Sequence, residues 1–120
     1  MFTEITSKKT HYLDSGKGEV IVLLHGFLES SFIWKSLSKK LSGKYRIINI
    51  DLPGHGASDD LGSDLSIDHM AKRVIALLKS LSIKKVRIIG HSMGGYVGLA
   101  MLEKDPDLIV QLILLHSKAG

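Results

Sequence analysis

One short segment, Gly-His-Ser-Met-Gly at residues 90–94, constrains the fold of this chain more than any other feature. An apolar run precedes it at residues 86–89, and a run typical of a helix follows at residues 95–102. This order predicts a strand, a tight turn and a helix, with Ser92 at the turn. The flanking glycines let the strand and helix approach closely, because a side chain at Gly90 or Gly94 would clash. We expect the hydroxyl of Ser92 to stand clear of its surroundings at the positive end of the helix.

Two further segments follow apolar runs in the same way. His-Gly-Phe at residues 25–27 follows the run at residues 20–24, and Asp-Leu-Pro-Gly-His-Gly-Ala-Ser at residues 51–58 follows residues 45–50. With these three segments in this order, the chain resembles the α/β-hydrolase family from about Val20 to its C-terminus. Within that family it looks most like the esterase and C–C-bond hydrolase branch, which carries similar His-Gly-Phe and Asp-Leu-Pro-Gly-His-Gly-x-Ser segments.

The resemblance implies a role for each segment. It makes Ser92 the nucleophile, held at a nucleophile elbow. It makes the backbone N–H groups of Met93 and Phe27 the oxyanion hole, which stabilises the charge that develops in acyl transfer. Met93 also suits this role for a local reason, because an amide at the start of a helix has no partner within the helix.

The alternation of apolar runs and helical patterns predicts an α/β fold. We expect a mainly parallel sheet of about six strands with helices on both faces, the N-terminal part of an α/β-hydrolase fold. Gly26, Asp51, Ser92 and His116 all follow strands, so they should gather at one rim of the sheet. The expected strands are one or two antiparallel ones within residues 2–14, then 19–24, 45–50, 85–89 and 108–115. The expected helices run from Ser30 or Ser31 to 41, with Phe32, Trp34, Leu37 and Leu41 as apolar contacts, and over 66–81 and 93–104.

Each candidate residue also has a plainer interpretation. Ser92 could be an ordinary helix N-cap, since serine is favoured at that position. The histidine and glycine at residues 25–26 could form a simple turn after a strand, and residues 51–58 read better as a rigid turn than as a source of catalytic Asp51 or His55. His25 and His91 are expected to be packed or hydrogen-bonded structural histidines, although with Gly26 and His116 they could also border a pocket.

The family places its acid and its histidine after the serine. Asp105, Asp107 and His116 follow Ser92 in that order, but both aspartates start the last strand and a strand of about eight residues spans roughly 25 Å. They therefore lie at the wrong end of the sheet. His116 is expected to be a pocket wall or a structural histidine, with a surrogate base as the alternative. Residues 1–120 then form a partial domain that lacks the later strands, the lid and the triad acid and histidine.

The last strand, residues 109–115, would leave an apolar sheet edge. We expect the 120-residue chain either to self-associate through this edge or to be part of a longer polypeptide. The composition, 44% hydrophobic and 23% charged, is typical of a globular domain. The chain has no cysteine, no apolar run of membrane-spanning length and no signal peptide, which fits a cytoplasmic protein. The net charge of +4 comes from scattered lysine doublets, which disfavours nucleic-acid binding.

These observations predict a serine hydrolase acting on a small ester or related acyl substrate, nearly inactive as this chain, with no cofactor, metal, nucleic-acid or membrane partner. The alternative is a non-catalytic binding or assembly module with the same fold.

Overall fold

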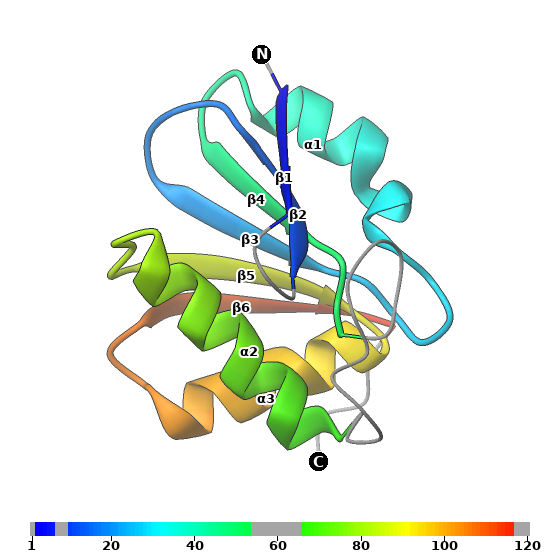
Figure 1. The fold of residues 1–120 in the computed structure, drawn as a ribbon, viewed down its shortest axis with the longest axis vertical. Coiled ribbons are helices and arrows are strands. Elements are labelled where there is room, and N and C mark those ends of the chain that lie inside the picture. Colours follow the sequence, from blue (N-terminus) through cyan, green and yellow to red (C-terminus); the bar gives the residue numbers. More distant parts are fainter. Residues whose placement is uncertain (1, 7–9, 54–65, 117–120) are drawn as a thin grey trace.

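A single mixed sheet forms the centre of the protein. The computed structural model describes residues 2–6, 10–53 and 66–116. The strands lie in the order β1-β2-β4-β3-β5-β6 (Figure 1). β1 pairs antiparallel with β2, and β2 with β4, whereas β4, β3, β5 and β6 are parallel to one another. The strands are β1 Phe2–Thr6, β2 His11–Ser15, β3 Val20–Leu24, β4 Arg46–Ile50, β5 Val86–His91 and β6 Ile109–Leu115. The predicted mainly parallel α/β architecture is therefore confirmed.

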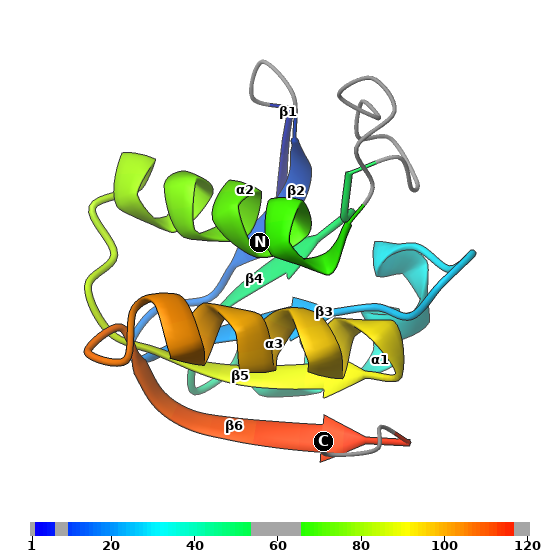
Figure 2. The ribbon, with the colours of Figure 1, turned by 90° about the horizontal axis from the view of Figure 1, so that it is seen from below.

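Helices cover both faces of this sheet, as the sequence predicts. α2 (Ile67–Ser80) and α3 (Met93–Lys104) lie on one face, and α1 (Lys35–Leu41) lies on the other (Figure 2). Along β3, Val22 and Leu24 belong to the core under α2 and α3, whereas Ile21 and Leu23 pack with Trp34 on the α1 side. A strand buried on both faces needs no polar alternation, which explains the continuous apolar run. None of the helices in these described ranges is long and apolar enough to cross a membrane.

Serine side chains begin two of the helical segments. The Ser66 hydroxyl accepts a hydrogen bond from His69 N–H at 3.1 Å and caps α2. The Ser30 hydroxyl accepts from Phe32 N–H at 3.3 Å. Here the prediction of one helix and of a Phe32 contact needs correction, because residues 31–34 form a short 3₁₀ helix, η1 (Ser31–Trp34), before α1 begins. The tighter turn buries Trp34 and leaves Phe32 72% exposed.

The sheet has an open edge at β6. Among the described residues β6 pairs with β5 alone, and the side chains of Val110, Ile113 and Leu115 are exposed. On the α1 face, a cavity of about 400 Å³ lies between Leu41 of α1 and Ile113 of β6, because the seven-residue α1 covers only the middle of the sheet. Figure 2 shows β6 as the outermost strand at this edge.

Candidate active site

The turn between β5 and α3 holds Ser92 in a strained backbone conformation. Ser92 has φ 52° and ψ −114°, in the left-handed half of the φ range that residues with a side chain rarely adopt. Its N–H donates to the carbonyl of Leu115 on β6 at 3.0 Å, and its carbonyl accepts from Gly95 N–H at 2.9 Å. Within the described residues, the Ser92 side chain makes no capping hydrogen bond to α3. The plainer interpretation of Ser92 as a helix N-cap therefore has no support in the geometry.

Two glycines make this turn possible, as the sequence indicates. A Cβ at Gly90 would lie 2.6 Å from the carbonyl oxygen of Gly94. A Cβ at Gly94 would lie 2.7 Å from the carbonyl oxygen of His25 and would overlap the carbonyl oxygen of Leu24. The N-terminus of α3 thus packs directly on the backbone at the end of β3. This contact brings the amide of Met93, the first residue of α3, to the side of the loop that follows β3.

That loop, residues 25–30, is a tight turn held by Glu29. The N–H of Glu29 donates to the Gly26 carbonyl at 3.2 Å, and Leu28 takes a left-handed φ of 60°. The Glu29 carboxylate accepts from Gly26 N–H at 2.7 Å and lies 2.9 Å from Nδ1 of His91. Partial burial would raise the pKa of Glu29, but the hydrogen bonds from His91 and Gly26 outweigh it and hold this pKa below its usual value. Glu29 therefore ties the loop to the residue that precedes Ser92.

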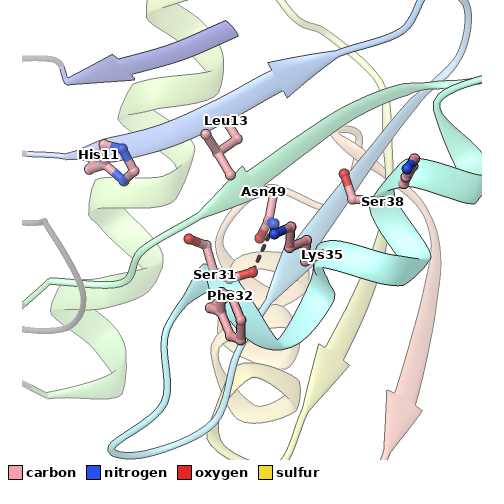
Figure 3. A pocket seen from close by; sticks show the side chains of 8 residues that line it. His11, Leu13, Ser31, Phe32, Lys35, Ser38 and Asn49 are labelled. Atoms are coloured by element: carbon pink, nitrogen blue, oxygen red, sulfur yellow. Dashed lines mark hydrogen bonds between the residues drawn. The ribbon is translucent and has the colours of Figure 1, made fainter. Parts of the chain in front are cut away.

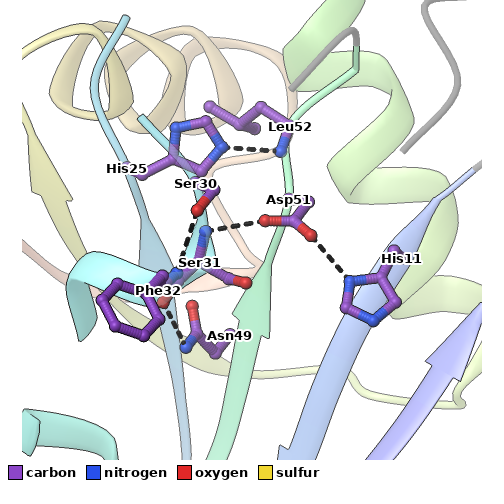
Figure 4. Close-up of polar contacts among 8 residues, drawn as sticks. All are labelled: His11, His25, Ser30, Ser31, Phe32, Asn49, Asp51 and Leu52. Atoms are coloured by element: carbon purple, nitrogen blue, oxygen red, sulfur yellow. Dashed lines mark hydrogen bonds and ion pairs between the residues drawn. The ribbon is translucent and has the colours of Figure 1, made fainter. Parts of the chain in front are cut away.

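His25 is a buried structural histidine (Figure 4). Its Nδ1 lies 2.7 Å from the Gly26 carbonyl, and its Nε2 lies 2.9 Å from Leu52 N–H. A carbonyl only accepts and an N–H only donates, so the proton of a neutral ring is assigned to Nδ1. With its side chain fully buried and both nitrogens engaged, His25 connects the loop after β3 to the end of β4.

A second buried connection, through Asp51, joins the end of the same loop to the residues that follow β4. One carboxylate oxygen of Asp51 accepts from Ser31 N–H at 2.6 Å, and the other lies 2.7 Å from Nδ1 of His11 on β2. Two residues earlier on β4, the amide of Asn49 donates to the Ser31 carbonyl at 2.9 Å. Asp51 is only 2% exposed, and both of its carboxylate oxygens are engaged in these contacts. His55 and the rest of the turn, residues 54–65, lie outside the described residues.

Sequence reasoning missed the roles of His11, Ser31 and Asn49. The only signal was a polar residue in or beside each otherwise apolar segment. Such a residue must be hydrogen-bonded when buried, but its partner cannot be read from the sequence.

His91 and His116 lie together at the rim of the sheet. Their ring centroids are 5.6 Å apart in an edge-to-face arrangement, and the Trp34 ring lies 6.5 Å from that of His91. Asp105 and Asp107 lie at the opposite end of β6. Lys85 Nζ donates to the Asp107 carbonyl there, and the Asp105 carboxylate lies 3.9 Å from Lys79 Nζ. The structure thus gathers Gly26, His91, Ser92 and His116 at one rim and keeps both aspartates away from it.

The chain is similar to known proteins along most of its length. A family model described as the alpha/beta hydrolase fold matches residues 19–119. An uncharacterized hydrolase, YugF, from Bacillus subtilis is 36% identical over 108 residues, which cover 89% of this chain and 39% of that protein. The pimeloyl-[acyl-carrier protein] methyl ester esterase of Nitrosomonas europaea is 34% identical, over 89% of this chain and 40% of the esterase. An (E)-2-((N-methylformamido)methylene)succinate hydrolase of Acinetobacter baylyi is 30% identical, over 92% of this chain and 42% of that enzyme.

Solved structures agree with these sequence matches. The epoxide hydrolase CorEH superposes with a TM-score of 0.95 at 30% identity, covering the whole of this chain and 44% of that one. A marine microorganism esterase superposes with a TM-score of 0.85 at 32% identity, covering 90% and 41%. The chain spans less than half the length of each of these proteins. The ordered segments, the strained serine turn and these matches lead to one conclusion: the chain belongs to the α/β-hydrolase fold family.

Proposed function

We propose that residues 1–120 carry the nucleophile and oxyanion-hole part of a serine hydrolase that acts on a small ester or related acyl substrate. Ser92 attacks the carbonyl carbon, and the N–H groups of Met93 and Phe27 hold the oxyanion. The observation that carries this proposal is the left-handed backbone at Ser92, between two glycines that no other residue could replace without a clash. Strain of this kind costs about 1–3 kcal/mol, so a fold retains it where it serves a purpose.

The oxyanion loop is also suitably rigid. Three hydrogen bonds of 2.6–2.9 Å, which involve Glu29, His25 and Asp51, fix residues 25–31. An oxyanion hole works because its donors are already oriented before charge develops, and each donor contributes roughly 3 kcal/mol to catalysis. The names of two relatives, a methyl ester esterase and a succinate-derivative hydrolase, support an acyl substrate.

The general base of this proposal comes from outside residues 1–120. Both nitrogens of His25 are engaged, and Nδ1 of His91 faces Glu29. Without a base, a serine hydroxyl is a weak nucleophile, so the 120-residue chain should be nearly inactive.

Labelling with a fluorophosphonate tests the proposal. We expect slow modification of Ser92, located by peptide mass spectrometry, and none at this site in Ser92→Ala. Ser80, on the exposed surface of α2, serves as the reference for a serine without an elbow. Equal labelling of Ser80 and Ser92 would show that the elbow confers no reactivity. Fast labelling of Ser92 that disappears in His116→Ala would show that a base is present within the chain.

The open edge of β6 supports a proposal about partners. Among the described residues β6 pairs with β5 alone, so its outer edge beside exposed Val110 and Ile113 can form a template for another strand. The isolated chain should therefore self-associate. Light scattering should show a mass above that of the monomer, and Val110→Lys should restore the monomer. A monodisperse wild-type monomer would contradict this proposal.

A further inference from the structure

A cavity lies between η1, α1 and the strands β2 and β4 (Figure 3). Its volume is about 630 Å³, within the range of roughly 300–1,000 Å³ that holds small organic ligands. None of the proposed catalytic groups at Phe27, Ser92 and Met93 lines it. It exists because the short α1 covers β4 and β3 and leaves the neighbouring part of β2 bare.

One wall of the cavity is positively charged. Lys35 and Lys39 are one helical turn apart on α1, so both side chains border the same space. Lys35 Nζ lies 5.6 Å from the centre of the Phe32 ring, which holds the ammonium group over the cavity. No acidic side chain in the described part of the chain lines the cavity. The two ammonium groups therefore favour an anion.

The remaining lining combines apolar surface with buried polar side chains, those of His11, Ser31, Ser38 and Asn49. Leu13 of β2 and Phe32 provide apolar surface. Asn49 of β4 is completely buried, and its Oδ1 has no hydrogen-bond partner among the described residues, although its Nδ2 donates to Ser31. A buried acceptor without a partner is unfavourable. Because this oxygen has almost no accessible surface, a ligand that brings a hydroxyl or N–H donor satisfies it only when the side chains that cover it move aside.

These features define the chemistry of an occupant. We propose that the cavity binds a small organic anion that has a carboxylate for Lys35 and Lys39, an apolar body for Leu13 and Phe32, and a hydroxyl donor for Asn49. The carboxylate takes the outer position beside α1, where it stays partly hydrated, and the apolar body lies against β2. The site is separate from the proposed catalytic serine and does not depend on hydrolase activity.

Titration of the ¹⁵N-labelled 120-residue chain with 6-hydroxy-2-naphthoate tests this site. The ring, carboxylate and hydroxyl of this probe match the three features of the cavity. We expect saturable changes in amide chemical shift centred on residues 31–39, 11–13 and 49. The neutral analogue 2-naphthol, which lacks the carboxylate, should bind more weakly. Ser92→Ala should bind the probe as the wild type does.

Matched charge variants complete the test. K35Q/K39Q should weaken binding by about twofold to thirtyfold, since each exposed ion pair contributes little. K40Q/K44Q removes the same charge from exposed lysines that do not line the cavity and should leave affinity unchanged. Leu13→Trp, which fills the cavity, should abolish binding. Equal effects of the two lysine pairs, shift changes centred on β6, or no saturable binding up to the solubility limit would overturn the proposal.

Discussion

Replacing Gly94 by alanine tests the close packing of α3 on β3. The new Cβ would lie 2.6 Å from the carbonyl carbon of Leu24 and 2.7 Å from the carbonyl oxygen of His25. These separations are roughly 0.8 Å shorter than the usual ~3.5 Å contact, and both neighbours are backbone atoms that cannot rotate away. Overpacking of this kind costs about 1–3 kcal/mol, and we expect the upper end. The better helix propensity of alanine returns about 0.5–1 kcal/mol. The free energy of unfolding should therefore fall by about 2 kcal/mol.

Gly98 offers a matched control in the same helix. There the nearest atom to a new Cβ is a Leu112 methyl at 2.7 Å, at the flexible end of a side chain, and the next is an Ile88 methyl at 3.4 Å. Because Leu112 can change rotamer, Gly98→Ala should change the free energy of unfolding by less than about 1 kcal/mol in either direction.

Urea unfolding measures both variants. The fluorescence of Trp34, the chain's single tryptophan, reports on the α1 side of the sheet, and far-UV circular dichroism reports on the helices. With a slope of about 1.5 kcal/mol per molar urea, Gly94→Ala should lower the unfolding midpoint by roughly 1.3 M. A midpoint no lower than that of Gly98→Ala would refute the proposed contact between α3 and β3.

Three further substitutions test the site. Ser92→Gly should raise the free energy of unfolding by about 1 kcal/mol, because glycine relieves the left-handed strain, and a lower urea midpoint would contradict that strain. Asp51→Asn should lower it by about 3 kcal/mol, because it alters a buried carboxylate that accepts from Ser31 N–H and contacts His11, whereas exposed Asp68→Asn should stay within about 0.5 kcal/mol, and thermal unfolding compares the two. The pKa of Glu29 is held below its ordinary 4.5, so the stability Glu29 contributes is present above that pH and lost as pH falls through the lowered pKa. The advantage of wild type over Glu29→Gln, under about 1 kcal/mol, should therefore be larger at pH 7 than at pH 3, and a constant difference would count against the hydrogen bonds that lower the pKa of Glu29.

Local patterns were enough to predict most of the secondary structure. The run at residues 20–24 is apolar at every position because β3 is central and covered on both faces. Ser66 marks the start of α2 because its hydroxyl satisfies a helix N–H that would otherwise lack a partner. The split at residues 31–34 was not predictable in this way, since 3₁₀ and α-helical turns differ by a fraction of a residue in period. That small difference decided the exposure of Phe32.

The candidate site was only partly predictable, for a different reason. Ser92 and its glycines are adjacent in sequence, so five residues specify the turn. The support of the neighbouring loop depends instead on residues far apart, since His11 and Asp51 are 40 positions apart and His25 and Leu52 are 27 positions apart. Their meeting depends on the antiparallel pairing of β2 with β4 and on the parallel pairing of β3 with β4. A single sequence contains no record of that register.

These long-range contacts also show what sets the shape of the proposed oxyanion loop. Asp51 and Leu52 directly follow β4, and they bind the residues at the two sides of the loop: Asp51 binds Ser31, which follows the loop, and Leu52 binds His25, which begins it. Covalent geometry fixes the distance between two adjacent residues, so both sides of the loop are held at a fixed separation. The two halves of the site meet where Gly94 touches the end of β3 and where the Glu29 carboxylate lies 2.9 Å from Nδ1 of His91. The position of the elbow relative to the oxyanion loop therefore depends on both contacts, one between backbones at Gly94 and one between the side chains of Glu29 and His91.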